Sequence, residues 1–201
     1  MKIGLGIPTL NRYDLLNIPL RKYVSDFDVY LVDNGNQNIQ QDNCKIFVQE
    51  KNIGVAASWN ILCREIFKKH DWALIANDDI VLGYDSGFVS SIPKPGCLFY
   101  RSKYDWAVFL IHVSLYMQVG SFDESFYPAY YEDSDYRHRM ALLGYPDRVD
   151  ERLNPLVFRQ SQTYESAPDL VNESMRRNRI VYMTKWGGPP LLEKYVKPYN
   201  I

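Results

Sequence analysis

Trp72-Ala73-Leu74-Ile75-Ala76 runs directly into Asn77-Asp78-Asp79, so a short apolar segment ends in an amide and two carboxylates. An unbroken apolar run of this length is typical of a strand buried on both faces of a sheet. Two adjacent carboxylates repel each other, which costs stability unless a cation or hydrogen-bond donors compensate. Mg²⁺ and Mn²⁺ favour carboxylate oxygens together with substrate phosphates, so the run is a candidate metal site. A turn in which an aspartate caps the next segment explains it equally well.

Three more apolar segments precede this strand, and helix-like segments separate them. Besides residues 72–76, the segments predicted as strands are 3–7, 29–32 and 46–48. Pro8 is expected to close the first strand, and Pro19 to break or kink a helix over residues 13–23. A second helix opens at Gly54. This alternation predicts an α/β fold, with a mostly parallel sheet covered on both faces.

Polar side chains follow all four predicted strands. In a parallel sheet the carboxyl ends of the strands meet at one edge, and ligands bind beyond that edge. The residues in this position are Thr9, Asn11, Arg12, Asp33, Asn34, Asn52, Asp78 and Asp79. Their shared placement favours a metal site over a simple turn at Asn77-Asp78-Asp79.

The helix start at Gly54 is a second candidate for binding a ligand. Small residues follow Gly54, and bare backbone amides at a helix N-terminus favour the approach of an anion. Close packing of the helix explains the same residues, and both explanations can hold together. Gly4-Leu5-Gly6 is no dinucleotide fingerprint, because it lies within a strand, lacks the third glycine and runs into Pro8.

Beyond residue 83 the pattern is looser. We expect a loop at 93–96, an apolar β-rich stretch from Trp106 to Tyr116, a helix from Glu132 or Asp133 to Gly144, and a last helix from 169 to about 185. The 201 residues suffice for one domain. Within it we expect two halves, residues 1–82 and 83–188, and a loose C-terminal tail (189–201).

Tyr130-Tyr131-Glu132-Asp133 sets two aromatic residues before an acidic pair. Acidic residues in the first turn of a helix face the positive end of its dipole, which explains Asp133 or Asp135 taken singly. It explains less well why two aromatic residues come first. The order suits an acceptor sugar stacked on a ring beside a carboxylate that acts as general base.

Composition excludes several classes of protein. The net charge is −1 with the two signs interspersed, so no basic stripe indicates nucleic acid and no polybasic patch indicates a membrane surface. No apolar run approaches the ~20 residues of a membrane span. Three widely spaced cysteines suit reduced thiols, and we expect a cytoplasmic protein. The three histidines lack metal-ligand spacing, and no G-x-S-x-G motif indicates a serine hydrolase.

Together these motifs resemble the family 2 glycosyltransferases of the GT-A fold, a Rossmann-like sheet flanked by helices, over residues 3–188. The matching segments are Ile7-Pro8-Thr9-Leu10-Asn11-Arg12, Val32-Asp33-Asn34-Gly35, Asn52-Ile53-Gly54 with Asn60, Asn77-Asp78-Asp79, Gly120-Ser121-Phe122-Asp123-Glu124 with Glu132-Asp133-Ser134-Asp135 and Arg139, and Asn178-Arg179 with Lys185-Trp186-Gly187. The last is similar to the rhamnosyltransferase-like branch. Small virus-encoded capsid glycosyltransferases have a similarly compact domain, which would place the protein in a host cytoplasm.

The resemblance implies a role for each of these positions. The donor-binding residues would be Pro8, Thr9, Asn11, Arg12, Asp33, Asn34, Asn52, Gly54, Asn60, Asn77 and Asp78, with Asp33 on the base and Asn77 near the ribose. Asp79 would bind Mn²⁺ or Mg²⁺, with Asp78 in support. Asp133 would be the catalytic base, and the acceptor-binding residues would be Trp106, Tyr130, Tyr131 and Glu132. Two positions depart from the family: Asn77 replaces an aspartate, and Arg159, a candidate phosphate contact, follows a segment where several relatives have histidine.

The expected function is therefore metal-dependent transfer of a sugar from a UDP- or dTDP-sugar to a carbohydrate hydroxyl of a glycan or glycoprotein. One alternative is a catalytically inactive module that binds nucleotide sugars or carbohydrate, against which Asp79 and Asp133 argue. Another is a sugar-nucleotide pyrophosphorylase, which shares the sheet. That enzyme needs a glycine-rich loop after the first strand, and residues 7–12 contain no glycine.

Overall fold

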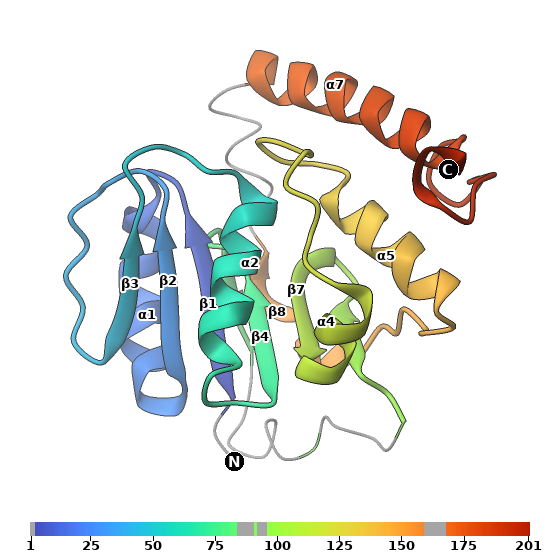
Figure 1. Cartoon of the computed structure of the whole chain (residues 1–201). Helices are drawn as coiled ribbons and strands as arrows, with labels where there is room; N and C mark the ends of the chain where they lie inside the picture. Colours follow the sequence, from blue (N-terminus) through green and yellow to red (C-terminus); the bar gives the residue numbers. More distant parts are fainter. Residues whose placement is uncertain (1–2, 84–90, 92–95, 159–167) are drawn as a thin grey trace.

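The computed structural model describes residues 3–83, 91, 96–158 and 168–201 (Figure 1). The strands are β1 (Gly4–Thr9), β2 (Asp28–Asp33), β3 (Cys44–Val48), β4 (Trp72–Ala76), β5 (Ile80–Leu82), β6 (Phe99–Ser102), β7 (Asp105–His112) and β8 (Pro155–Phe158). The helices are α1 (Tyr13–Asp26), α2 (Val55–Ile66), α4 (Val113–Val119), α5 (Glu132–Leu142) and α7 (Pro168–Trp186), with 3₁₀ turns at Glu151–Leu153 and Pro198–Asn200.

A six-stranded sheet in the order β3-β2-β1-β4-β7-β6 forms the centre of the molecule. The first four strands run parallel, whereas β7 is antiparallel to β4 and to β6. β5 and β8 form a separate antiparallel pair. The predicted α/β fold with a mostly parallel sheet is therefore confirmed. Among the described residues, no helix combines the length and the apolar character that a bilayer crossing requires.

Two apolar cores lie on opposite faces of this sheet. Because successive side chains of a strand point to opposite faces, β2 sends Leu31 to one core and Val32 to the other. Helix α1 covers the first core with Leu16, Leu20 and Tyr23, and α2 covers the second with Trp59, Leu62 and Ile66. Figure 1 shows these helices on the two sides of the strands. All five residues of β4 are buried, as their unbroken apolar run predicts.

Neither proline ends its element, so the expected strand end at Pro8 is wrong and Pro19 does not break its helix. Pro8 lies inside β1 and is paired in register with Val32. The ladder between β1 and β4 stops at Gly6, so no partner on that side requires an N–H from Pro8. Helix α1 continues through Pro19 to Asp26. An interior proline costs about 3 kcal/mol, and the helix persists because it buries an apolar face on the sheet.

The C-terminal half also departs from the prediction, since β6 and β8 were not expected and residues 112–119 and the tail differ. The β-rich stretch ends at His112, whose Nδ1 accepts a hydrogen bond from the Ser114 N–H (3.1 Å) and so caps α4, which was not predicted. The tail is not loose at its beginning. The N–H groups of Lys194 and Tyr195 donate to the carbonyl oxygen of Trp186 at 3.0 and 3.1 Å, and fold the chain back on the end of α7.

Candidate functional site

The carboxyl ends of β1, β2 and β4 lie side by side at one edge of the sheet. Thr9 is in register with Asp33, and the carbonyl oxygen of Thr9 accepts from the N–H of Asn34 at 2.9 Å. On the other side, the N–H of Asn77 donates to the carbonyl oxygen of Ala107 at 3.0 Å. The structure therefore brings the predicted strand-end residues together, and it adds the start of β7 to them.

Asp78 and Asp79 share a largely buried position at this edge. Burial raises the pKa of Asp78 to about 6, and the charge on Asp79 adds to the rise, while the Thr9 hydroxyl and the Leu10 N–H oppose it. Burial also raises the pKa of Asp79. Oδ1 of Asp79 is buried and has no hydrogen-bond partner within the described part of the chain. A carboxylate oxygen in this state is destabilised until a cation or a donor reaches it.

This acid pair fits a divalent cation. Mg²⁺ and Mn²⁺ commonly bind through one or two carboxylates, and substrate phosphates and waters complete the shell. Over residues 3–83, 91, 96–158 and 168–201 there is no group of three or more His, Cys, Asp or Glu side chains that could hold a metal. The protein would therefore supply Asp79 and Asp78, and the ligand would supply the remaining oxygens.

The loop after β1 places one cation beside the acid pair. The positive charge of Arg12 lowers the pKa of both Asp78 and Asp79, although burial outweighs it. Nε of Arg12 also lies 3.2 Å from Oδ1 of Asp14. Asn11 adopts a left-handed φ of 56°, and its side chain packs so closely on Gly35 that a Cβ there would lie 2.1 Å from Oδ1 of Asn11. Glycine at 35 is thus required by this loop.

Asp33 shapes the loop after β2 and does not face a ligand. Its side chain is fully buried, with Oδ1 accepting from the Gly35 N–H and the Gln37 Nε2, both at 3.0 Å. Oδ2 accepts from the N–H of Gln37 at 2.7 Å. The predicted contact between Asp33 and a nucleotide base is therefore wrong, because the carboxylate is enclosed by its own loop.

Asn34 and Asn60 are also structural, contrary to their predicted place in the donor site. Asn34 donates to Oγ of Ser58 (2.9 Å) and accepts from the N–H of Ile53 (3.2 Å). The amide of Asn60 donates to the carbonyl oxygen of Phe122 (2.9 Å) and accepts from the Phe122 N–H (2.8 Å). Both residues are buried, so their amides tie α2 to neighbouring segments.

Gly54 is required by close packing. Its φ is +86°, and a Cβ at this position would lie 2.9 Å from the carbonyl oxygen of Pro128. The same oxygen accepts from the N–H of Val55 at 2.8 Å. Oδ1 of Asn52 accepts from the Gly54 N–H (2.9 Å). The backbone carbonyl oxygen of Asn52 accepts from the hydroxyl of Tyr127 (3.2 Å). The first amide of α2 is therefore not bare, and the predicted anion site at Gly54 is wrong there.

Two acidic residues begin α5 in a poorly solvated position. Glu132 is buried, and Oε2 of its carboxyl has no hydrogen-bond partner among the residues described. Burial, with the charge of Asp133 in addition, raises the pKa of Glu132 well above its usual range. Burial also raises the pKa of Asp133; Asp105 adds to the rise and Arg137 opposes it. Oδ1 of Asp133 accepts from the N–H of Ser134 at 2.6 Å. A carboxylate with a raised pKa is well suited to accept a proton.

Asp105 lies near the start of α5, a position that the sequence did not reveal. It begins β7, two residues before the Ala107 carbonyl that meets Asn77, and its charge acts on Asp133. Its Oδ1 accepts from Nη2 of Arg137 at 2.5 Å, so the start of β7 is tied to α5. Only the antiparallel pairing of β4 with β7 puts it there, and nothing in the spacing of the sequence signals that pairing.

The predicted sugar platforms divide into one buried and two half-buried residues. Trp106 is only 3% exposed and packs in the core against Trp59 and Phe99, at ring-centroid distances of 6.3 and 4.6 Å. The prediction that Trp106 binds the acceptor is therefore wrong, since its ring is enclosed. Tyr130 and Tyr131 are half-buried directly before α5. Arg159 lies outside the described residues.

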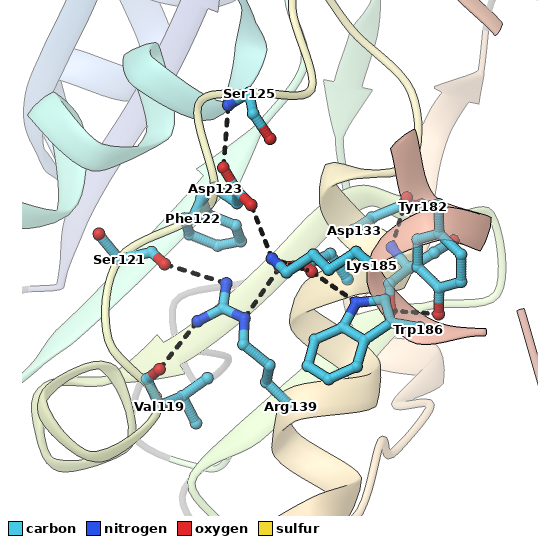
Figure 2. Close-up of polar contacts among 12 residues, drawn as sticks. Val119, Ser121, Phe122, Asp123, Ser125, Asp133, Arg139, Tyr182, Lys185 and Trp186 are labelled. Atoms are coloured by element: carbon cyan, nitrogen blue, oxygen red, sulfur yellow. Dashed lines mark hydrogen bonds and ion pairs between the residues drawn. The ribbon is translucent and has the colours of Figure 1, made fainter. Parts of the chain in front are cut away.

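A buried ion cluster fastens α7 to the acidic segment (Figure 2). Nζ of Lys185 lies 2.6 Å from Oδ2 of Asp123 and 2.6 Å from Oδ1 of Asp135. Asp135 also accepts from Nε of Arg139 (2.9 Å) and from Nε1 of Trp186 (2.8 Å). Asp135 is fully buried, so its charge depends on these donors. The Asp123, Asp135, Arg139 and Lys185 motif positions are thus structural.

Comparisons with known proteins agree with this fold. No protein-family model matches the chain. A galactofuranosyl glycosyltransferase of Leishmania donovani is 49% identical over 55 residues, and the match spans 27% of this chain and only 13% of that protein. The catalytic domain of Drosophila β1,4-galactosyltransferase 7, solved with xylobiose, superimposes with a TM-score of 0.53 and 11% identity over 82% of this chain and 72% of that one. GalNAc-T7, solved with UDP, GalNAc and Mn²⁺, gives a TM-score of 0.66 and 11% identity over 92% of this chain and 49% of that one. The chain therefore has the GT-A glycosyltransferase fold.

Proposed function

We propose that the protein is a glycosyltransferase that moves a sugar from a UDP- or dTDP-sugar to a carbohydrate hydroxyl, with Mn²⁺ or Mg²⁺ at Asp79 and Asp78. The observation that carries this proposal is the buried, unpartnered Oδ1 of Asp79 beside a second carboxyl whose pKa is raised to about 6. The pair lies at the carboxyl edge of a parallel sheet, where such folds bind ligands. Two neighbours of similar fold were solved with manganese and UDP-Gal, or with UDP, GalNAc and Mn²⁺.

The donor would lie over the first half of the chain, residues 1–82. A bound cation would neutralise charge on the leaving diphosphate. The Thr9-to-Arg12 loop borders the same acid pair, and the Arg12 guanidinium would meet a diphosphate oxygen. Pro8 and Asn77 would border the donor at the same edge, with Asn77 near the ribose. A dTDP-sugar remains in the proposal because the C-terminal helix resembles the rhamnosyltransferase-like branch.

The acceptor would lie over residues 83–188, at the start of α5. Asp133 would take the proton of the acceptor hydroxyl as its oxygen bonds to the anomeric carbon and the nucleoside diphosphate leaves. The raised pKa of Asp133 strengthens it as a base. Burial also raises the pKa of Glu132, and its carboxyl would lie beside Asp133 as a hydrogen-bonding partner of the acceptor. Tyr130 offers the ring on which a sugar would stack, with Tyr131 beside it.

The decisive experiment is a thermal-shift panel of UDP-, GDP- and dTDP-sugars with and without Mn²⁺, followed by donor turnover. The donor site is supported if the shift in Tm requires the metal and is absent in Asp79→Asn. The control Asp42→Asn, at an exposed position, should still show the shift. Release of nucleotide from the same sugar nucleotide then identifies an enzyme. Binding without turnover would instead favour a non-catalytic binding module. No shift with any sugar nucleotide would refute the proposal.

A further inference from the structure

Residues 127–131 form a bridge between the donor half and α7, and this bridge leads directly into α5. On one side, the carbonyl oxygen of Pro128 accepts from the N–H of Val55 at 2.8 Å. On the other side, the carbonyl oxygen of Ala129 accepts from Oγ of Ser174 and from Nδ2 of Asn178, both at 2.8 Å. The donors on the two sides belong to helices far apart in the sequence, so the bridge exists only when both have docked.

The next two residues have an uncommon backbone conformation. Tyr130 and Tyr131 have φ values of 76° and 75°, in the left-handed region that favours glycine. A non-glycine residue held there stores strain, which persists only where surrounding contacts fix the chain. The carbonyl oxygen of Tyr130 accepts a hydrogen bond from Nδ2 of Asn178 at 3.1 Å. Asn178 thus holds the chain at the strained position and at the residue before it.

Asn178 is the better placed of the two α7 donors. Its side chain is fully buried, and its Nδ2 donates to two consecutive carbonyls. If Ser174 lost its hydroxyl, Ala129 would still have Asn178 as a donor. If Asn178 lost its amide, the carbonyl of Tyr130 would lose the bond that Asn178 provides, and no hydrogen bond to it from Ser174 is present to compensate. The two residues therefore form a matched pair on one face of one helix.

We propose that Asn178 is a positioning residue for the transfer reaction. By holding Ala129 and Tyr130 it keeps the backbone of Tyr130 and Tyr131 left-handed, and it thereby sets where Tyr130 and the carboxyls that begin α5 meet the acceptor. The proposal rests on the proposed function for its catalytic consequence. Its geometric part, the immobilisation of residues 129–131, stands independently. Helix α7 would accordingly support the active site through its hydrogen bonds to residues 129 and 130.

The test compares Asn178→Ala with Ser174→Ala in the full chain. Chymotrypsin cleaves after exposed tyrosines in mobile segments, so mass spectrometry can follow cutting after Tyr130 and Tyr131. We expect faster cleavage at these bonds in Asn178→Ala than in the wild type or in Ser174→Ala. Calorimetric titration with UDP and Mn²⁺ then counts intact donor sites. We expect full stoichiometry in both variants, because Asn178 does not contact the donor half.

The catalytic readout is turnover of UDP-galactose, or of the sugar nucleotide that the panel selects, per UDP-binding site. In Asn178→Ala we expect kcat to fall by about 10²-fold, the effect of a small displacement of reacting groups, with the KM for the donor unchanged. Ser174→Ala should keep both constants. Equal cleavage and equal kcat in the two variants would overturn the proposal, as would a loss of kcat that only matches a loss of UDP sites. If the wild type turned over no sugar nucleotide, the proposed function would fail, and the cleavage comparison would still decide whether Asn178 holds the bridge.

Discussion

Replacing Asp78 with asparagine should make the metal-free protein more stable at pH 7. Burial, with the charge of Asp79, raises the pKa of the Asp78 carboxyl from 3.8 to about 6. A rise of that size means that the ionised carboxylate destabilises the folded state by about 3 kcal/mol. Asparagine has nearly the same shape and carries no charge, so it removes this penalty. For a chain of this length, about 3 kcal/mol corresponds to a rise in Tm of about 10 °C.

The sign of the effect gives it a characteristic pH dependence. Below about pH 4 both the folded and the unfolded protein hold the proton on Asp78, so the variant has no advantage in stability over the wild type. As the pH rises, the unfolded chain ionises first and the wild type loses stability, until the folded carboxyl also ionises near pH 6. The advantage of Asp78→Asn should therefore grow between about pH 4 and pH 6 and then stay constant.

The assay is urea unfolding in EDTA at several pH values between 4 and 8. Asp42→Asn, at an exposed position, is the control for removal of one negative charge. With Mn²⁺ and UDP at about 100 times their Kd, the wild type should gain about 2.7 kcal/mol, and Asp78→Asn should gain less because a ligand of the cation is missing. An advantage of Asp78→Asn that is absent, or that is the same at every pH, would refute the reasoning that burial sets the properties of this carboxyl.

Three further outcomes follow from the geometry. Asp133→Asn should lower the rate of sugar transfer by about 10²- to 10⁴-fold while UDP and Mn²⁺ still bind. Kinetics measure transfer and calorimetry measures binding, and an unchanged rate would show that Asp133 is not the base. Lys185→Met should destabilise the protein by about 3 kcal/mol, because Asp135 stays buried with one cation fewer; urea unfolding measures this, and an unchanged midpoint would contradict it. Gly54→Ala should cost more stability than Gly144→Ala. Both have positive φ, but only at Gly54 would the new Cβ meet a backbone oxygen, at 2.9 Å, so equal losses in Tm would count against close packing at Gly54.

Strands β1 to β4 could be predicted from sequence because each contains a run of adjacent apolar residues, whereas the short β5 was not predicted. β4 is apolar at every position and is buried at every position, and the bounds predicted for it are those observed. The Asn77-Asp78-Asp79 run then falls at the edge where the other strand ends meet. Local patterns of this kind need no knowledge of distant contacts.

The failures among the site residues share one physical cause. Asp33, Asn60 and Trp106 have side chains that serve equally well in binding or in packing, and only the tertiary structure decides between these uses. Asp33 closes its own loop, Asn60 bonds a chain segment some sixty residues away, and Trp106 fills a core of aromatic rings. The position of Asp105 was not predicted because it depends on how β7 pairs with β4.

The β4–β7 ladder also bears on how such a chain could be recombined in evolution or engineering. β4 lies within residues 1–82 and β7 within residues 83–188, yet they are paired from Trp72 with His112 to Ala76 with Val108. Phe109 of β7 also completes the apolar core beneath α2. A chimera that exchanged the chain after residue 82 would therefore replace β7, which pairs with β4 and contributes to the core of residues 1–82. Changes in the loop before α5 would leave the shared ladder intact.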